Sequence, residues 1–184
     1  MDNVKALKAQ LIKHHYTHSV PSGKSWYYSF DTAVVCFAIP PNPYISRYLI
    51  GEPNKVLELS RLWAPDGHEP NLLTRAISKA VGMLRQDARE YEALVSYADP
   101  NVGHEGFVYR AASWVPIGQS EEGRYYVDAA GLVVSRRKFH SGSRHLTKPE
   151  ILRLGYQELK RPGKIRFARG LTARARRAIR ELAR

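Results

Sequence analysis

A strand–helix–strand–helix–strand pattern in the middle of the sequence restricts the possible folds of this chain more than any other feature. Pro65 and Gly67 separate the first strand from a long helix, for which Asn71 is a suitable N-cap. Two strands that are joined by one helix lie parallel in a sheet. The five segments are at residues 56–63, 71–90, 94–98, 106–113 and 114–118. We therefore predict an α/β fold with a mixed (α+β) sheet.

Further elements are predicted on both sides of this pattern. Apolar residues at helical spacing indicate helices, and aromatic and β-branched runs indicate strands. The predicted elements are an N-terminal helix, one long strand or a bent pair, another strand, a hairpin and two amphipathic segments, at residues 2–14, 26–39, 48–51, 125–134, 148–159 and 172–183. With 184 residues, the chain is long enough for one domain with a hydrophobic core.

Basic residues are concentrated in the last quarter of the sequence. Residues 136–184 carry 16 Lys and Arg against three acids, whereas residues 1–135 carry 13 basic and 14 acidic side chains. Such dense positive charge lowers stability unless a partner neutralises it, and Arg, which accounts for 12 of the 16, binds phosphate in a bidentate manner. We therefore predict a core at 1–135 and a basic extension at 136–184, which packs on the core and contacts double-stranded DNA. A membrane surface is the weaker alternative, because the Arg-rich stretch lacks a bulky apolar face.

The composition excludes several classes of protein. The single cysteine, Cys36, rules out a disulfide framework and a cysteine-cluster zinc site, and it fits a reducing compartment. No apolar run is long enough for a membrane span, and the first residues lack the apolar segment of a secretory signal. We expect a soluble, cytoplasmic protein.

Several segments resemble one enzyme family. They are His14-His15-Tyr16, Glu58 to Trp63, Ser96 to Pro100, Gly103 to Trp114 and Gly163 to Phe167. With the order of the elements, they resemble the GNAT acyltransferase superfamily and, within it, the Mom family of phage DNA-adenine modification enzymes. The stretch that begins with Asp99 and ends with Trp114 is the most specific part of this resemblance.

The resemblance implies a GNAT-like fold and a transferase. Such an enzyme converts the exocyclic N6 amine of adenine in DNA to a carbamoylmethylated form, and this protects phage DNA from restriction. DNA and a small-molecule donor are then the partners, and the host cytoplasm is the location of a phage-encoded enzyme. Two alternatives stay open: a GNAT N-acyltransferase that uses acyl-coenzyme A on a protein or small-molecule amine, and a DNA-binding protein without enzymatic activity.

Four residues are assigned to the catalytic site. Asp99 follows the strand at 94–98, and open α/β sheets bind ligands at the carboxyl ends of their strands. The resemblance favours a role in which Asp99 takes or orients the proton of the adenine amine, while capping of the next turn is the alternative. Tyr109 is expected to hydrogen-bond the base or the donor, or else to be a core residue. Tyr16 and His15 are expected to line the same pocket.

Three residues are assigned to the donor. Arg61, Ser60 and Thr74 lie before and within the start of the long helix, where GNAT enzymes bind the pyrophosphate of an acyl-coenzyme A. Here residues 65–70 contain two acids, two prolines without an N–H and one glycine, instead of a glycine-rich loop. An acyl-coenzyme A-like donor is therefore possible but open. Arg61 at a sheet edge and Thr74 in solvent are the structural alternatives.

A metal site and a DNA surface complete the candidates. His15 and Asp99 are possible ligands of an iron-type centre, although the spacing of the histidines matches no tight metal pattern. Phosphate contacts are assigned to basic side chains of the C-terminal region: Arg136, Arg137, Arg161, Lys164, Arg166 and Arg169. The sequence leaves open whether the final Arg-rich helix docks on the core or becomes ordered only on DNA. The oligomeric state is also left open.

Overall fold

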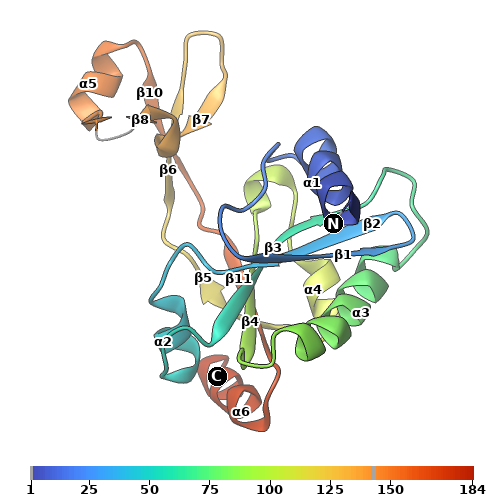
Figure 1. Ribbon diagram of the computed structural model, residues 1–184. Coiled ribbons are helices and arrows are strands. Elements are labelled where there is room, and N and C mark those ends of the chain that lie inside the picture. Colours follow the sequence, from blue (N-terminus) through green and yellow to red (C-terminus); the bar gives the residue numbers. More distant parts are fainter. Residues whose placement is uncertain (1, 142–143) are drawn as a thin grey trace.

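The computed structural model describes residues 2–141 and 144–184, and within them a six-stranded sheet forms the centre of the fold (Figure 1). The strand order is β1-β2-β3-β4-β11-β5, and within this sheet only the β3/β4 pair is parallel. The strands are β1 (Ser25–Phe30), β2 (Ala33–Ala38), β3 (Val56–Trp63), β4 (Ala93–Ala98), β5 (Val115–Gln119) and β11 (Ile165–Gly170). The mixed sheet that the sequence predicts is confirmed.

Helices cover both faces of this sheet, because successive residues of each strand point to opposite sides. Val35 and Leu94 join the hydrophobic core beneath α3 and α4. On the opposite face, Val34 clusters with α1, and Val95 clusters with α2 and α6. The helices are α1 (Asp2–His14), α2 (Ile45–Ile50), α3 (Leu72–Asp87), α4 (Phe107–Ala111) and α6 (Ala173–Leu182).

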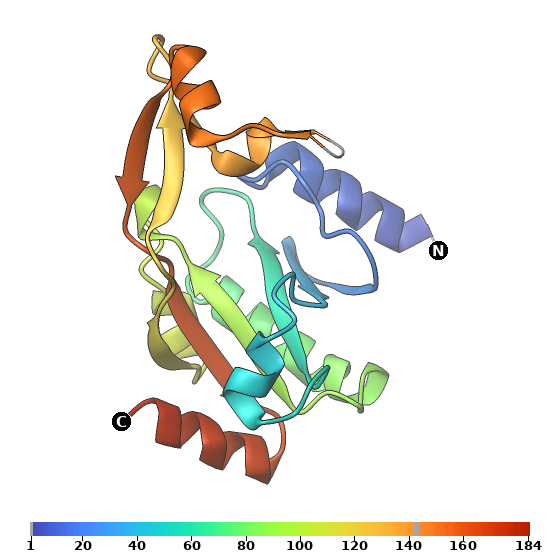
Figure 2. The same cartoon turned by 90° about the vertical axis from the view of Figure 1, so that its left-hand side faces the viewer.

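A small lobe, which we call the arm (residues 121–162), projects from the central sheet (Figures 1 and 2). Its sheet has the order β10-β6-β7, and its own core contains Tyr126, Phe139 and Ile151. The arm consists of β6 (Gly123–Val127), β7 (Val133–Ser135), η2 (Arg136–Phe139), β8 (His140–Ser141), β9 (Arg144–His145), α5 (Lys148–Arg153) and β10 (Gln157–Arg161). The predicted hairpin is therefore present as β6 and β7, and the predicted segment at 148–159 is divided between α5 and β10.

The C-terminal region is an integral part of the central sheet. β11 lies between β4 and β5, although the sequence predicts residues 136–184 to be an extension on a core of residues 1–135. The boundary at residue 135 falls inside the arm, between β7 and η2. Sequence reasoning misses β11 because Arg166 and Arg169 interrupt its apolar residues. Both arginines are partly buried through contacts within the protein.

Two other predictions change in detail. The predicted strand at 48–51 is wrong, because residues 48–50 belong to α2 and Gly51 follows the helix as its C-cap in a left-handed conformation (φ +76°). Glycine is well suited to that C-terminal position. The run at 26–39 is a pair of strands, β1 and β2, that reverses at Asp31.

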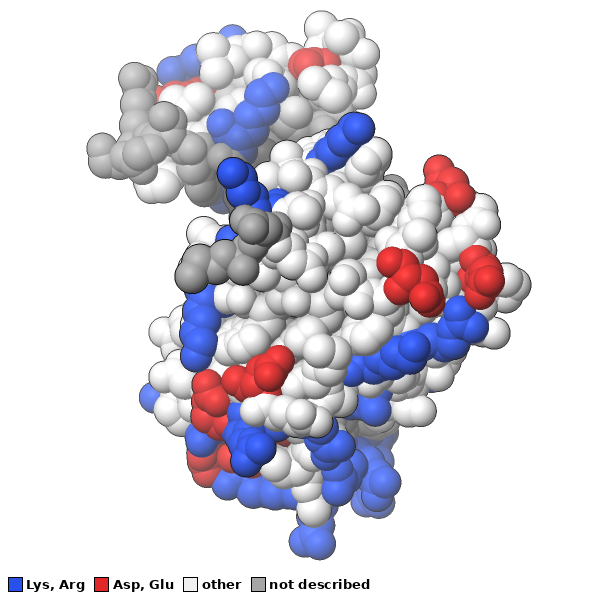
Figure 3. Space-filling model, turned by 45° about the vertical axis from the view of Figure 1, so that its right-hand side comes forward, with Lys and Arg blue, Asp and Glu red and all other residues white. Residues whose placement is uncertain are grey.

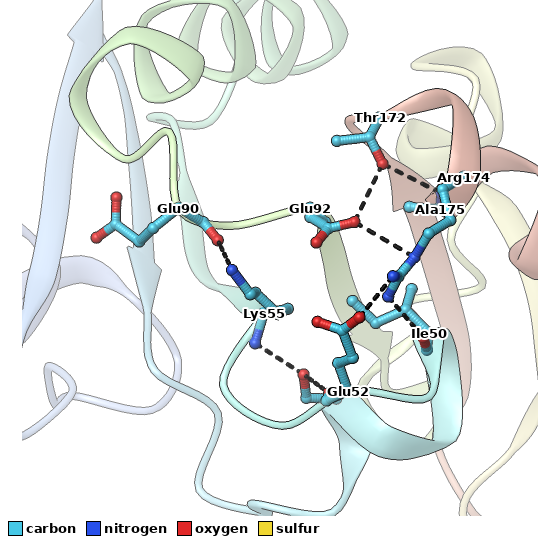
Figure 4. Close-up of polar contacts among 9 residues, drawn as sticks. Ile50, Glu52, Lys55, Glu90, Glu92, Thr172, Arg174 and Ala175 are labelled. Carbon is cyan, nitrogen blue, oxygen red and sulfur yellow. Dashed lines mark hydrogen bonds and ion pairs between the residues drawn. The ribbon is translucent and has the colours of Figure 1, made fainter.

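The final helix is docked, which the sequence left open. Ala175 and Ile179 of α6 are buried in the cluster that also contains Leu49 of α2. Arg174 fixes the start of the helix: its guanidinium contacts Glu52 at 2.5 Å and Glu92 at 3.6 Å (Figure 4). The helix therefore packs on the core without a bound partner.

Basic side chains gather at the end of the molecule where α6 lies (Figure 3). α6 follows the end of β11 that pairs with Ala93, whereas Asp99 follows the opposite end of β4. At about 3.3 Å per residue, the length of β4 separates the start of α6 from Asp99 by roughly 17 Å or more. The Arg-rich helix is therefore not beside Asp99. No helix of the described residues is long and apolar enough to span a membrane.

Candidate functional site

Asp99 and Lys164 form an ion pair at the end of the central sheet. Ile165 pairs with Ala98, and so the residues next to them, Lys164 and Asp99, come together although they are far apart in the sequence. The Lys164 Nζ lies 3.0 Å from Asp99 Oδ2. Asp99 is 6% exposed, and so its carboxylate needs such partners.

Asn101 holds the other oxygen of Asp99. Its backbone N–H and its side-chain Nδ2 donate to Asp99 Oδ1 at 3.0 Å and 2.9 Å. Burial raises the pKa of the carboxyl group, but the hydrogen bonds from Asn101 and the ammonium of Lys164 outweigh it, and the pKa lies below its ordinary value. Asp99 is therefore ionised at neutral pH. It also caps η1 (Pro100–Val102), as the alternative interpretation proposed.

His15 and Tyr16 lie on the loop that follows α1. His15 is 5% exposed, and its Nδ1 accepts a hydrogen bond from the backbone N–H of Thr17 at 3.2 Å. Burial, with smaller contributions from Arg61 and neighbouring histidines, lowers the pKa of His15 to about 4. The imidazole is therefore neutral at pH 7 and has Nε2 as its N–H donor.

The ring of Tyr16 lies close to two histidine rings. Its centroid is 4.5 Å from that of His15 and 5.5 Å from that of His104. Burial raises the pKa of the Tyr16 hydroxyl, and the charges of Lys164 and Asp99 act on it in opposite directions. Tyr16, which is 48% exposed, thus combines a reachable ring with proximity to the ion pair.

Arg61 connects β3 to the loop that carries His15 and Tyr16. The register of β2 and β3 shifts by one residue, so that Cys36 pairs with Arg61, Phe37 pairs with Leu59, and Ser60 has no partner in the ladder. The Arg61 Nε donates to the carbonyl oxygen of Ser19 at 2.9 Å, and one of its terminal nitrogens donates to Ser60 Oγ at 3.1 Å. The guanidinium that the sequence assigns to binding of the small-molecule group donor therefore holds this loop in place.

Tyr109 lies at the point where β3 and β4 separate. The parallel ladder ends at Glu58 and Val95, although both strands continue. Beyond this point, Ser96 Oγ donates to the carbonyl oxygen of Leu59 at 2.9 Å and also bonds the Tyr109 hydroxyl. Burial raises the pKa of Tyr109 to about 12, and so the hydroxyl stays protonated.

The start of α3 is poorly suited to a pyrophosphate. Asn71 precedes the helix as predicted, but in a left-handed conformation (φ +62°) and without a capping bond from its side chain. The N–H of Leu72 donates to the carbonyl oxygen of Glu69 at 3.2 Å, and so one amide of the first turn is already used. Thr74 lies in this turn and makes no hydrogen bond to the residues around Asp99 within the described chain.

Comparison with known proteins identifies the family. A sequence model described as the Mom protein family matches residues 2–182. This chain belongs to the Mom protein family. A methylcarbamoylase named Mom, from Escherichia phage Mu, is 33% identical over 92 residues. These residues make up 50% of this chain and only 38% of that relative.

In this Mom family chain, two of the arginines predicted to bind phosphate contact the protein itself. Arg166 and Arg169 are three residues apart on β11. Because successive side chains of a strand point to alternate faces, these two point to opposite faces of the sheet. The Arg166 guanidinium lies 5.2 Å from the centroid of the Tyr48 ring, and Arg169 donates to the carbonyl oxygen of Ala112 at 2.9 Å. One phosphate strand cannot contact both.

The other predicted DNA contacts lie on the arm or at its base. Arg136 is exposed on η2, and Arg161 stacks on the ring of Tyr125 at 5.4 Å. Lys164 lies at the base of the arm in the pair with Asp99. The side chain of Arg137 lies outside the described part of the structure. Of these residues, Lys164 contacts Asp99 directly, whereas the arginines of α6 lie at the other end of the sheet.

In this member of the Mom family, the residues around Asp99 do not fit an iron centre. Among the described residues, no group of three or more His, Cys, Asp and Glu side chains could hold a metal ion. The two candidates are His15 and Asp99, and the ammonium of Lys164 lies next to Asp99, in a position that a cation would need. The Nδ1 of His15 is also used by Thr17.

Sequence reasoning missed two residues around Asp99. Asn101 follows Asp99 at the spacing of an Asx turn, and this spacing could have revealed its role. Tyr125 offered no such signal, because its proximity to Tyr16 depends on contacts between distant segments.

Proposed function

We propose that this chain is a transferase that modifies the N6 amine of adenine in DNA to a carbamoylmethylated form and so protects phage DNA from restriction. One observation carries the proposal: the family match covers residues 2–182, which include the motif residues Asp99, Tyr16 and His15. The proximity of Tyr16 to Asp99 and Lys164 supports it. The name of the phage Mu relative supports the transfer of a carbamoyl-containing group.

The proposed role of Asp99 is to bind the amine that reacts. A carboxylate has about four acceptor positions, and the described contacts from Asn101 and Lys164 use three of them. The remaining position is on Oδ2, which accepts a hydrogen bond from the N6 amine. Because Asp99 is ionised, it stabilises the positive charge that develops on the nitrogen.

The chemical step needs an activated donor of the carbamoylmethyl group. The lone pair of N6 forms the new N–C bond, and the bond from that carbon to the leaving group breaks with its electron pair. The nitrogen then loses a proton to Asp99, from which it passes to solvent or to the leaving group. The neutral Nε2–H of His15 is a donor suited to the carbonyl of the transferred group. The hydroxyl of Tyr109 is buried and already bonded to Ser96, and so its role is to hold the end of β4 in place.

The proposal requires the adenine to leave the base stack. An amine inside a duplex cannot reach a carboxylate that is 6% exposed, and so the base must be displaced and held on an aromatic surface. The ring of Tyr16, which lies beside His15 and His104 and is 48% exposed, is suited to this purpose.

Mass spectrometry of nucleosides tests the proposal. DNA from cells that express the wild-type chain is expected to contain adenine with an added carbamoylmethyl group, and DNA from cells with Asp99→Asn is expected to lack it. Asp99→Asn keeps the size of the side chain and its bonds to Asn101. Unmodified adenine in the wild-type sample, with the protein present and folded, would overturn the proposal.

A further inference from the structure

The ring of Tyr125 on the arm is turned back toward the central sheet. A Cβ at Gly123 would lie 2.5 Å from Tyr125 Cε2, and the nearest atoms to it all belong to this ring. Gly123 precedes Tyr125 by two residues in β6 and is closer to Ser120, where the arm begins. The glycine therefore lets the ring lie along the strand toward the base of the arm.

Arg161 covers one side of this ring. It pairs with Gly123 across the β6/β10 ladder, and its guanidinium lies 5.4 Å from the centroid of the Tyr125 ring. Tyr125 itself is only partly buried, whereas Tyr126, the next residue, belongs to the core of the arm. One tyrosine thus stabilises the arm, and its neighbour presents a supported aromatic ring on the opposite side of β6.

The base of the arm is joined directly to the candidate site. Lys164 N donates to Ser120 Oγ at 2.9 Å, and Ser120 N donates to the carbonyl oxygen of Lys164 at 2.9 Å. Asn101 Nδ2, which also bonds Asp99, donates to the carbonyl oxygen of Pro162 at 3.2 Å. The arm therefore has a defined position relative to Asp99.

The orientation of the ring brings its hydroxyl near the site. Burial is the largest influence on the pKa of both Tyr16 and Lys164, and the Tyr125 hydroxyl also acts on both. Tyr16 comes from the N-terminal loop and Tyr125 comes from the arm. Two tyrosines from different parts of the fold thus lie near Lys164.

We propose that Tyr125 contacts the target nucleotide: the displaced adenine stacks on its ring, on the side away from Arg161, and Tyr16 forms the facing wall. This inference rests on the proposed function and adds a residue that binds the substrate. Every base has an aromatic face, and so stacking holds the base without selecting its identity. The arm is then part of the active site, and Arg161 lies next to the nucleotide's phosphate.

Three substitutions test this role by nucleoside mass spectrometry. Tyr125→Ala removes the ring and is expected to lower adenine modification at least about tenfold, in line with the usual value of one base–aromatic stack. Tyr125→Phe keeps the ring and is expected to stay within about threefold of wild type. Gly123→Ala displaces the ring without removing it, and is expected to lower modification as Tyr125→Ala does.

A matched control is available at Tyr44, which is 70% exposed and precedes α2, far from the arm in the fold. Tyr44→Ala is expected to leave modification unchanged. Thermal unfolding checks that each variant folds, and affinity for a DNA duplex is expected to change less than about twofold, because the ring contacts no phosphate. If Tyr125→Ala does not fold, Gly123→Ala decides.

The outcomes separate this inference from the proposed function. If DNA from cells that express the wild-type protein contained no modified adenine, the proposed function would be overturned, and with it the substrate that Tyr125 is proposed to bind. Modified adenine in the wild type and at equal level in folded Tyr125→Ala or Gly123→Ala would overturn the role of Tyr125 alone. A loss in Tyr125→Phe as large as in Tyr125→Ala would also overturn it, because stacking would then not be the interaction that matters.

Discussion

The ammonium of Lys164 lies 3.0 Å from a carboxylate oxygen of Asp99, and this pair joins the base of the arm to the end of β4. Lys164 is also bonded through its backbone to Ser120, on the other limb of the arm. The candidate site and the arm are thus connected by one lysine.

Lys164→Met removes the ammonium and keeps the apolar stem. Because Asp99 then remains as a buried carboxylate with one partner fewer, we expect the free energy of unfolding at pH 7 to fall by about 1–2 kcal/mol. Urea unfolding measures this change. In the double variant Lys164→Met/Asp99→Asn, the combined loss should be smaller than the sum of the single losses, and strict additivity would contradict the pair.

The same pair predicts how stability depends on acid. The folded pKa of Asp99 is lowered, and so its contribution is present above the unfolded pKa of about 3.9 and is lost as pH falls through the folded value. The difference in stability between wild type and Asp99→Asn should therefore shrink below about pH 4. A difference that grows with acid would show that the carboxylate is not stabilised in the fold.

His15 predicts a loss of stability at mildly acidic pH. Its folded pKa is about 4, against 6.5 for a free histidine, and so the unfolded chain takes up a proton that the folded chain excludes. The contribution of His15 to the free energy of unfolding is fully present above pH 6.5. It falls as the pH decreases toward 4, by at most about 1.4 kcal/mol per pH unit.

His15→Asn should remove this pH dependence. The amide oxygen can accept the hydrogen bond of Thr17 in place of Nδ1, and an amide does not titrate. Urea unfolding of both proteins at about pH 7.5 and about pH 5 measures the difference. If the free energy of unfolding changed equally between the two pH values in both proteins, His15 would be protonated in the folded chain.

The sequence predicts those parts of the fold that depend on local pattern. The apolar alternation of β3 and the helical spacing of α3 are sufficient to place the β3–α3–β4 unit, and Asp99 follows from its position after β4. β11 could not be predicted, because its arginines become compatible with a central strand only through Tyr48 and the carbonyl of Ala112. Such compensation depends on partners that are distant in the sequence.

The candidate site divides in the same way. Asp99, His15 and Tyr16 were found from the family motif, and the structure brings them together. The sequence assigns Lys164 to phosphate alone, because its partner Asp99 is set by the pairing of β4 with β11. Tyr125 was missed because its direction depends on Gly123, and a sequence pattern does not report the direction of a side chain.

Gly163 predicts a large effect of one methyl group at the base of the arm. A Cβ at Gly163 would lie 1.8 Å from the backbone oxygen of Ser120, and backbone cannot move aside as a flexible side chain can. We expect Gly163→Ala to lower the free energy of unfolding by about 1–3 kcal/mol or more, and to lower adenine modification because Lys164 is displaced.

Gly82 is the matched control for this glycine. It lies inside α3, has no atom within 4 Å of an added Cβ, and does not have a positive φ. Gly82→Ala should therefore raise the free energy of unfolding by about 0.5–1 kcal/mol through helix propensity. The two substitutions should move thermal unfolding in opposite directions, and a shift of the same sign would contradict the steric explanation.

Arg136 and Arg169 predict two separable effects of removing a positive charge. Arg136 is exposed on the arm, and so Arg136→Ala should leave stability within about 0.5 kcal/mol. If Arg136 contacts a phosphate, the variant should bind duplex DNA more weakly, and the slope of log affinity against log salt should become less steep by about 0.9.

Arg169 instead bonds the carbonyl oxygen of Ala112 at the end of α4, and Arg169→Ala should lower the free energy of unfolding by about 1 kcal/mol with an unchanged salt slope. Affinity measured over a range of salt concentrations, beside urea unfolding, distinguishes them, and a reduced salt slope for Arg169→Ala would assign this arginine to the DNA surface after all.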